Sequence, residues 1–272
     1  MPPTVLPTSP YRVSADSWLI PTLAAAPTGG YLGAHSLVIR GAEPVVVDTG
    51  CALARDLWAA QVFSVVEPED VRWIFLSHSD HDHVGNLDLI VDRCPNATVV
   101  ANFGIVGHLA GDRDLPLHRM QWRDPGESFA VGDRTLQVVR PPMFDAPNTR
   151  GLYDPKDRLL WAVDSFGALF PGGVLEADDI PADLFDPTFA ALNSWNTPWL
   201  EWVDRDRYAQ HVASTSDLDL DLVVSAHGPV LRGTRIADAF SRTLALAAAP
   251  PVPQPGQSML DDMLRVALGA VA

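Results

Sequence analysis

The stretch His78-Ser79-Asp80-His81-Asp82-His83 places three histidines and two carboxylates within six residues. It directly follows the apolar run Trp73-Ile74-Phe75-Leu76, which is typical of a buried strand. Imidazole and carboxylate groups at this density resist burial unless a cation holds them. A solvated polar loop would explain a lone His-x-Asp, but it does not explain this cluster. The sequence therefore predicts a metal site.

The expected direction of the side chains supports this prediction. Alternate side chains of an extended loop point the same way, so we expect His78, Asp80 and Asp82 to converge on one centre. His83 adds a second nitrogen where Val84-Gly85-Asn86 turns the chain into a helix.

Strands and helices alternate on both sides of the cluster. Strands are expected at 35–40, 44–48, 71–76, 97–101, 137–140, 159–164 and 222–229. Helical patterns occupy 52–66, 86–93, much of 181–214, and 235–248. Several strands end in a carboxylate or a histidine, such as Asp48, Asp164 and His227. This order favours one α/β domain with its site along a sheet edge.

Composition divides the chain into four parts. Residues 1–10 hold four prolines and no apolar periodicity, which predicts a loose arm. Residues 11–249 are expected to form the α/β domain and residues 250–257 a proline-rich linker. Residues 258–272 are expected to form a short amphipathic helix.

Charge and cysteine content narrow the class of protein. A formal charge of −15 argues against nucleic acid and anionic membranes as partners, because both need clustered Lys and Arg. No run of about 18 apolar residues and no signal-like start is present. Cys51 and Cys94 are too few for a disulfide framework and are each expected to be small buried residues. We expect a cytoplasmic protein with a small-molecule ligand or substrate; a homo-oligomer stays open.

These motifs together resemble the metallo-β-lactamase superfamily. The matching pieces are Val46-Val47-Asp48-Thr49-Gly50, the cluster from His78 to His83 with Gly85, Asp164, and Ser225-Ala226-His227-Gly228-Pro229. They extend from about residue 31 to about 248 and so cover most of the chain. The resemblance implies a four-layer αββα sandwich with a dinuclear metal site at one edge.

Position 80 separates two branches of that superfamily. Its hydrolases carry His-x-His-x-Asp-His, whereas this chain has Asp80 at the second ligand place. An acid there is more similar to the oxygen-reducing di-iron domain of flavodiiron proteins, which carry Glu. The segment Val163-Asp164-Ser165-Phe166-Gly167 also resembles that group's sequence around its bridging aspartate.

The resemblance implies a role for each matching position. It places His78 and Asp80 on the first metal, with Asp164 bridging the two ions. It places three further residues on the second metal, namely Asp82, His83 and His227.

One ligand of the resemblance is missing. The superfamily has a histidine within the segment matching residues 141–147, but this chain has none between His118 and His211. Asp145 stands at the matching place and is favoured as the substitute, because hard cations accept carboxylate readily. The alternatives are a weakly held first metal, or replacement by His81 or His118.

The ligand set argues about the identity of the metal. Seven ligands would comprise four carboxylates and three imidazoles, which suits iron or manganese better than zinc. We therefore expect two metal ions, with iron favoured and manganese or zinc as alternatives.

Three functions are compatible with such a site. The first is a di-iron oxidoreductase that binds or reduces O2 or NO. The second is a hydrolase that uses a metal-bound hydroxide. The third is a non-catalytic oxygen or redox sensor. Flavodiiron proteins carry a flavodoxin-like domain that supplies electrons, and this chain is too short to hold one. The redox function would therefore need a separate electron-donor protein.

Three other features receive plainer interpretations. His35 is expected to be a surface or core-edge histidine, and Asp48 is expected to anchor loops behind the ligands. Trp195, Trp199 and Trp202 are expected to belong mainly to the core.

Overall fold

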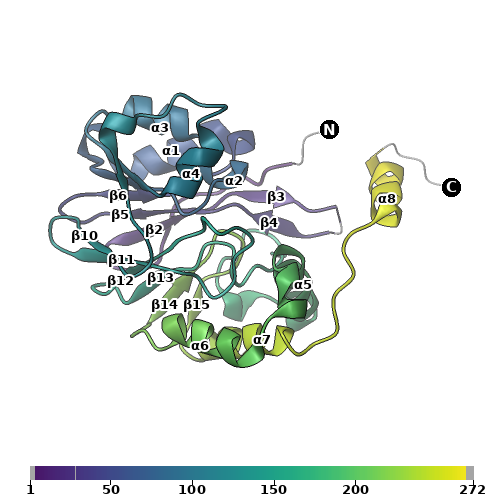
Figure 1. Ribbon diagram of the computed structural model, residues 1–272. Helices are drawn as coiled ribbons and strands as arrows, with labels where there is room; N and C mark the ends of the chain where they lie inside the picture. The colour runs from purple at the N-terminus through teal and green to yellow at the C-terminus, as the bar shows by residue number, and fades with distance from the viewer. Residues whose placement is uncertain (1–3, 28, 268–272) are drawn as a thin grey trace.

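Two β-sheets lie face to face, with helices on the outer side of each, in a computed structural model that describes residues 4–27 and 29–267 (Figure 1). The first sheet has the strand order β1 (Tyr11–Arg12), β2 (Ser17–Ile20), β5 (Ser36–Ile39), β6 (Val45–Val47), β7 (Trp73–Phe75), β8 (Thr98–Ala101) and β9 (Met120–Trp122). The second has the order β10 (Ser128–Ala130), β11 (Thr135–Val139), β12 (Gly151–Asp154), β13 (Leu159–Trp161), β14 (Leu222–Val224) and β15 (Leu231–Arg232). A hairpin is formed by β3 (Leu23–Ala25) and β4 (Tyr31–Gly33).

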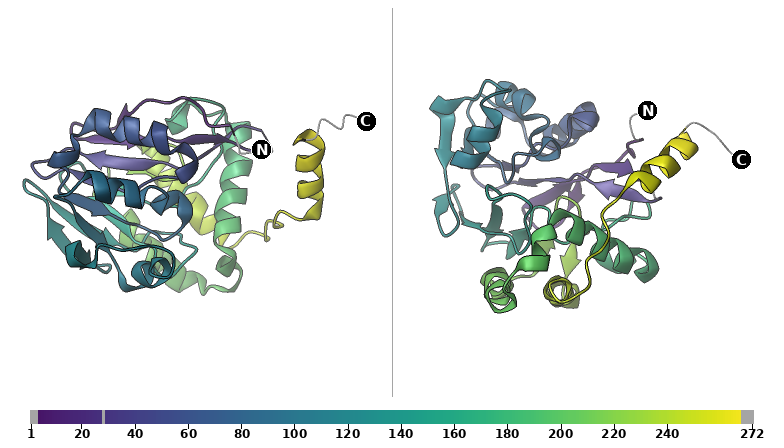
Figure 2. Two further views of the ribbon diagram at one scale, coloured as in Figure 1. Left: turned by 90° about the horizontal axis from the view of Figure 1, so that it is seen from above. Right: turned by 45° about the vertical axis from the view of Figure 1, so that its right-hand side comes forward.

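The helices form the two outer layers. Those over the first sheet are α1 (Arg55–Val65), α3 (Leu87–Arg93) and α4 (Phe103–Leu109), and those over the second are α5 (Ala182–Asn196), α6 (Arg205–Ser216) and α7 (Thr234–Leu246) (Figures 1 and 2). The short helix α2 (His81–Val84) belongs to the ligand cluster. Single turns of 3-10 helix are η1 (Ala52–Ala54), η2 (Pro68–Asp70), η3 (Leu117–Arg119), η4 (Ala177–Asp179) and η5 (Pro198–Trp202). This arrangement confirms the predicted four-layer αββα sandwich.

The core has three layers because both faces of the central strands are covered. In β6, Val45 and Val47 pack between the two sheets, whereas Val46 packs against α1 beside Trp58. Successive side chains of a strand point to opposite faces, so strands buried on both faces read as continuous apolar runs. The third layer lies under α5 and α7, where Phe166 packs against Phe240.

The strand directions place the polar residues at one edge. Strands β6, β7, β8 and β9 are mutually parallel, and so are β13 and β14 in the other sheet. The chain leaves β7 toward His78, β13 toward Asp164 and β14 toward His227. Ligands in open α/β sheets bind beyond such carboxyl ends.

The N-terminal segment is tied down more firmly than a loose arm. The Leu6 N–H donates to the Leu23 carbonyl at 2.9 Å, and the Ala25 N–H donates to the Thr4 carbonyl at 2.8 Å. The hydroxyl of Thr8 donates to the Pro21 carbonyl at 2.6 Å. Prolines remove N–H donors but leave carbonyl acceptors, so such a segment can still pair with an exposed strand. Residues 1–3 lie outside the described part of the chain.

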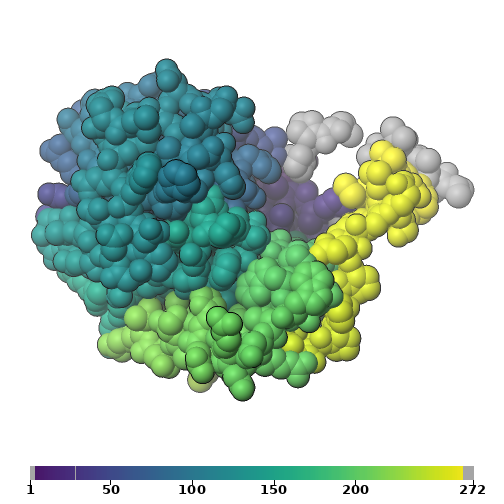
Figure 3. All heavy atoms as spheres, in the orientation of Figure 1, coloured from purple at the N-terminus to yellow at the C-terminus, as the bar shows by residue number. Residues whose placement is uncertain are grey.

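The C-terminal helix α8 (Gln257–Ala267) projects from the sandwich (Figure 3). The linker before it is held at one point, where Trp195 Nε1 donates to the Pro253 carbonyl at 2.9 Å. Residues 268–272 of the predicted helix lie outside the described residues, so its predicted end remains a prediction. None of the helices described is both long and apolar enough to cross a membrane.

Candidate metal centre

The backbone of residues 78–83 is extended up to Asp80 and helical from His81 onward. Asp80 is extended, with φ −71° and ψ 152°, and the N–H groups of His83 and Val84 both donate to its carbonyl as α2 begins. The alternation that relates His78 to Asp80 therefore ends before Asp82. Asp82, inside α2, turns toward His227 instead, so the alternation of side chains covers only His78 and Asp80, and Asp82 lies in a second group of ligand atoms.

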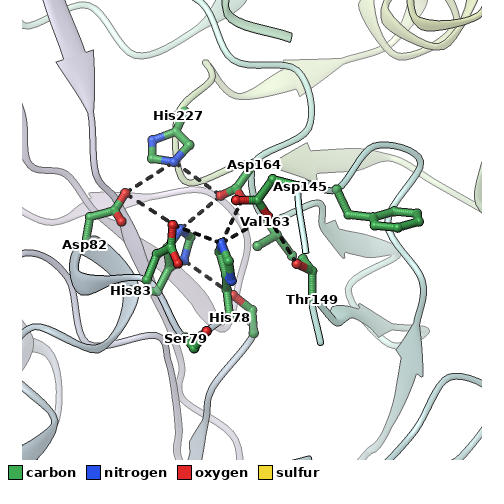
Figure 4. A network of polar contacts seen from close by, with 12 residues as sticks. His78, Ser79, Asp82, His83, Asp145, Thr149, Val163, Asp164 and His227 are labelled. Atoms are coloured by element: carbon green, nitrogen blue, oxygen red, sulfur yellow. Dashed lines mark hydrogen bonds and ion pairs between the residues drawn. The ribbon is translucent and has the colours of Figure 1, made fainter. Parts of the chain in front are cut away.

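The seven predicted ligand residues meet at one place, and Figure 4 labels all of them except Asp80. Their ligand atoms form three overlapping groups, each with all atoms within 4.8 Å of one another. These groups are His78 with Asp80 and Asp145, His78 with His83 and Asp164, and Asp82 with His83 and His227. Because His78 and His83 each belong to two of these groups, the seven residues outline two adjacent metal positions.

Asp164 lies between the two centres. Its Oδ2 is 3.5 Å from His78 Nε2, while its Oδ1 is 2.9 Å from His83 Nε2 and 3.2 Å from His227 Nε2. Each carboxylate oxygen thus faces a different set of imidazoles. This is the geometry that a bridging carboxylate needs.

The remaining carboxylates complete the two sets. Asp145 Oδ1 is 3.2 Å from His78 Nε2, and Asp80 Oδ2 is 3.5 Å from the same atom. On the other side, Asp82 Oδ2 is 3.3 Å from His227 Nε2 and 3.8 Å from His83 Nε2. The first set is rich in oxygen, and the second holds two imidazoles.

The contacts within the site fit a cation better than hydrogen bonds. Asp164 Oδ1 is buried and makes no hydrogen bond with any described residue, although two imidazole nitrogens lie within 3.2 Å of it. Ligands bound at about 2.1 Å to one ion lie roughly 3 Å apart. The donor set accordingly fits two metal ions.

The electrostatics also favour cations. Burial opposes the charged form of Asp164, but His83 and His227 hold its pKa well below the usual value. Burial likewise opposes the charged form of His83, yet Asp164, Asp48 and Asp82 raise its pKa well above the usual value. The negative field of the carboxylates thus outweighs burial, and it would attract a metal ion as it attracts protons.

Groups behind the ligands fix the direction of two imidazoles. Asp48 is fully buried, and its Oδ2 lies 2.9 Å from His83 Nδ1. His227 Nδ1 donates to the Gly33 carbonyl at 2.7 Å. Both contacts leave Nε2 facing the site, as is usual for metal-binding histidines. The anchoring role predicted for Asp48 is consistent with this geometry. The contact of His227 with the Gly33 carbonyl was not predicted, because every residue has a backbone carbonyl and the sequence does not single one out.

Two backbone positions at the site have φ in the left-handed region. They are Asp48, with φ 59°, and Val163, with φ 55°. The Val163 carbonyl accepts from the Ala226 N–H at 2.7 Å and from Ser225 Oγ at 2.9 Å. These two bonds hold the residue directly before Asp164.

The loop that carries Asp145 is held by two arginines. Arg140 Nη1 donates to the carbonyls of Pro147 and Thr149 at 2.7 and 2.9 Å. Arg150 Nη1 donates to the same two carbonyls at 2.8 and 2.9 Å. Burial lowers the pKa of Arg140 to about 10, and the charge of Arg150 adds to this effect. Sequence reasoning missed this pair, because arginine-to-carbonyl bonds follow no spacing rule.

The histidines proposed as substitutes lie elsewhere. Within the described chain, neither His81 nor His118 belongs to a group of ligand atoms, although His81 lines the cavity above the site. His35 is only 1% exposed and accepts from the Thr22 N–H through Nδ1 at 3.2 Å. Burial lowers the pKa of His35 to about 3, so it is a neutral core histidine.

A cavity of about 460 Å³ opens over the centres. Its apolar wall includes Leu32, Leu53 and Leu192, and the half-buried thiol of Cys51 also lines it. Cys51 is therefore not the buried core residue that was predicted, whereas Cys94 is fully buried. None of the three clustered tryptophans lines this cavity, and Trp202 is 80% exposed rather than part of the core. A larger cavity near Arg40 and Arg72 contains none of the predicted ligands.

Comparisons with known proteins find relatives that are similar in sequence or in fold. The anaerobic nitric oxide reductase flavorubredoxin of Pectobacterium atrosepticum is 22% identical over 200 residues, which cover 73% of this chain and 39% of the relative. The flavodiiron protein from Giardia intestinalis has a similar structure, with a TM-score of 0.77 at 19% identity over 88% of this chain and 59% of that one. Rubredoxin oxygen:oxidoreductase from Desulfovibrio gigas gives 0.78 at 15% identity, over 90% and 63%.

These likenesses differ in what they establish. At such low identity the solved structures show the fold alone. The chain spans about half the length of the first curated relatives that it matches, 48% and 45%. The family described as ODP family beta lactamase, however, matches residues 34–228, which are most of this chain and include every predicted ligand. The chain belongs to the ODP family of beta-lactamase-fold proteins.

Proposed function

We propose that this chain binds two iron ions through seven residues and reduces O2 or NO with electrons from a separate protein. The ligands would be His78, Asp80, Asp82, His83, Asp145, Asp164 and His227. The observation that carries the proposal is Asp164, whose two oxygens face different imidazole sets and whose Oδ1 lacks a hydrogen bond among the described residues.

The ligand chemistry supports iron over zinc. Four carboxylates against three imidazoles form a hard, negatively charged set, which suits iron or manganese. The printed names of relatives mention nitric oxide reduction in one case and oxygen oxidoreduction in another. We carry both substrates to this chain as part of the proposal.

The residues of the chain would have distinct tasks in such a reaction. The bound iron pair would supply one-electron redox chemistry and a place for a diatomic ligand. Asp164 would hold the two ions at a short separation, and Asp48 and the Gly33 carbonyl would keep His83 and His227 aimed at them. Leu32, Leu53 and Leu192 would limit access of water.

Metal content tests the proposal directly. Protein purified from iron-replete cells without added zinc should contain about two iron ions per chain. Its absorption should show a charge-transfer band that bleaches on reduction and returns in air. Two zinc ions per chain and no response to O2 would reject the redox function.

The cavity gives a reason to keep hydrolysis as the second candidate. Its volume of about 460 Å³ and apolar wall would accept an organic substrate far larger than a diatomic gas. A metal-bound hydroxide would then attack an ester, thioester or phosphodiester. Rapid cleavage of a generic ester by the zinc-loaded protein, together with inert iron-loaded protein, would favour this function.

The cellular setting belongs to the same proposal. Cys51 and Cys94 are both free thiols, which fits a reducing compartment such as the cytoplasm. The electron donor and the oligomeric state remain predictions.

A further inference from the structure

A tryptophan of the second helical layer contacts the loop that carries Asp145. Trp199 lies in η5, and its Nε1 donates to the Phe144 carbonyl at 2.7 Å. The rings of Trp199 and Phe144 also pack against each other at a tilt, with centroids 5.2 Å apart. The indole therefore holds Phe144 both through a directed bond and through ring packing.

The accepting carbonyl belongs to the peptide unit that joins Phe144 to Asp145. A peptide unit is planar, so a bond that fixes the direction of its carbonyl also fixes the plane that contains the Asp145 nitrogen and Cα. The Asp145 side chain leaves that Cα toward His78, and its Oδ1 lies 3.2 Å from His78 Nε2. A single hydrogen bond thus connects Trp199 with the peptide unit of a proposed ligand of the first metal.

The other bonds that hold this loop act at other positions along it. The Met143 N–H donates to Ser165 Oγ at 3.1 Å, before Asp145, and the two arginines described above donate to carbonyls that follow it. Within the described part of the chain, the Phe144 carbonyl accepts only from Trp199, and the Asp145 N–H makes no hydrogen bond. The bond from Trp199 is therefore the one described hydrogen bond that acts on this peptide unit.

The length of the Asp145 side chain makes the direction of that peptide unit important. An aspartate ends closer to its own Cα than a histidine does, so it reaches an ion only where the backbone is held nearer to that ion. The Asp145 side chain is 32% exposed, and Thr149 Oγ1 lies 3.5 Å from its Oδ1, at the limit of a hydrogen bond. Neighbouring side chains thus restrict the carboxylate only weakly, and its position depends on the backbone.

Trp199 itself is held firmly but is not enclosed by the core. The Leu200 N–H donates to the Thr197 carbonyl at 3.1 Å, and Leu200 is only 6% exposed, which anchors η5. The Tyr208 ring contacts Trp199 edge to face, with centroids 5.7 Å apart. A cavity of about 250 Å³ opens beside Trp199 and Phe144, so a smaller ring at position 199 can be accommodated without a clash.

We propose that Trp199 is a positioning residue for the first metal and acts through the peptide unit between Phe144 and Asp145. This inference rests on the proposed function, because it requires that Asp145 is a ligand. Loss of the indole N–H lets that peptide unit rotate, and the carboxylate then points less often in the direction that the ion requires. The second metal has no proposed ligand on this loop and is not affected.

Titration with Co²⁺ tests the inference without any redox turnover. The visible absorption of bound Co²⁺ reports its coordination, and Asp145→Asn identifies the first centre as the one that this variant weakens. Trp199→Phe keeps an aromatic ring but removes the N–H. It should weaken Co²⁺ binding at the first centre about tenfold and change the absorption of that ion. Affinity at the second centre should stay the same.

A double-mutant cycle separates positioning from a general structural effect. If Trp199 acts through Asp145, the double variant Trp199→Phe/Asp145→Asn should bind Co²⁺ at the first centre no more weakly than Asp145→Asn alone. Additive losses would overturn the inference, because they would mean that Trp199 influences the metal by another route.

Trp195 offers a matched control in the same helical layer. Its Nε1 also donates to a backbone carbonyl, that of Pro253 in the linker, at 2.9 Å. Trp195→Phe removes an equivalent bond without touching the loop of Asp145, and it should leave both affinities unchanged. Wild-type affinities in Trp199→Phe, or equal losses in the two tryptophan variants, would also overturn the positioning role. If the wild type binds fewer than two Co²⁺ ions, or if Asp145→Asn weakens neither centre, the proposed ligand set fails instead.

Discussion

At the scale of single residues, Asp145 is the proposed ligand that stands where the superfamily has a histidine. Its side chain is about one-third exposed, and its Oδ1 lies 3.2 Å from His78 Nε2. Arg140 and Arg150 both donate to the Pro147 carbonyl and so hold the loop that carries Asp145. The position of the Asp145 carboxylate is thereby restricted. The first centre should therefore depend on this residue far more than the second.

Replacing Asp145 with Asn should weaken the first metal by at least about tenfold and leave the second nearly intact. The loss of one negative oxygen ligand is the physical reason. Metal titration followed by elemental analysis measures both sites, with Asp88→Asn, an exposed aspartate on α3, as the control. Equal loss at both centres, or none, would contradict the assignment of Asp145.

At the scale of elements, Arg134 joins three strand ends of the sandwich. Its side chain is 1% exposed, and Nη1 donates to the equally buried Asp154 at 2.7 Å. Nη2 forms an ion pair with Asp16, beside β2. The residue therefore connects the β10–β11 hairpin with the end of β12 and with the first sheet.

The variant Arg134→Met should destabilise the fold by about 3–5 kcal/mol, because it leaves Asp154 buried without its cation. Urea unfolding at pH 7 measures this loss. Burial opposes the charged form of Asp16, but Arg134 and Lys156 lower its pKa below 3.8. Its stabilising effect is thus fully present above pH 4 and is lost as pH falls through the lowered pKa. That acid-dependent part should shrink in the variant; an unchanged pH profile would refute the role of Asp16.

The sequence patterns predicted the layered architecture but not the individual contacts within the candidate metal centre. The run Val45-Val46-Val47 and the ends of strands at Asp164 and His227 could be recognised, because buried strands and polar ends leave periodic signals. The turn of Asp82 toward His227 could not, because it depends on where helix α2 begins. Contacts to backbone atoms, such as His227 with the Gly33 carbonyl, depend on tertiary structure alone.

At the scale of the whole molecule, the candidate metal centre lies between the two sheets. His78, Asp80, Asp82 and His83 follow a strand of the first sheet, whereas Asp145, Asp164 and His227 follow strands of the second. Ions bound between them would be lost when the sheets separate. Their binding free energy therefore contributes to the stability of the complete sandwich.

Removal of the metal should accordingly lower the stability of the whole domain in one cooperative step. At a free ion concentration of about 1,000 times Kd, each independent ion contributes roughly 4 kcal/mol. Calorimetry of the loaded and chelator-treated protein measures this difference. An Asp164→Asn variant should show little dependence on added metal, whereas a wild type that melts alike with and without metal would contradict the linkage.

The left-handed backbone at Val163 has a consequence of its own. A β-branched residue at φ 55° is strained by about 1–3 kcal/mol and persists only where neighbouring groups enforce it. Ser225 Oγ supplies one of the two bonds that do so, and it also accepts from the His227 N–H at 3.2 Å. A Ser225→Ala variant should let this peptide relax and turn Asp164 away from both ions. Isothermal titration should then show weaker binding at both centres together, even though no ligand has been altered, whereas unchanged affinities would mean that the Ala226 bond suffices to keep the backbone strained.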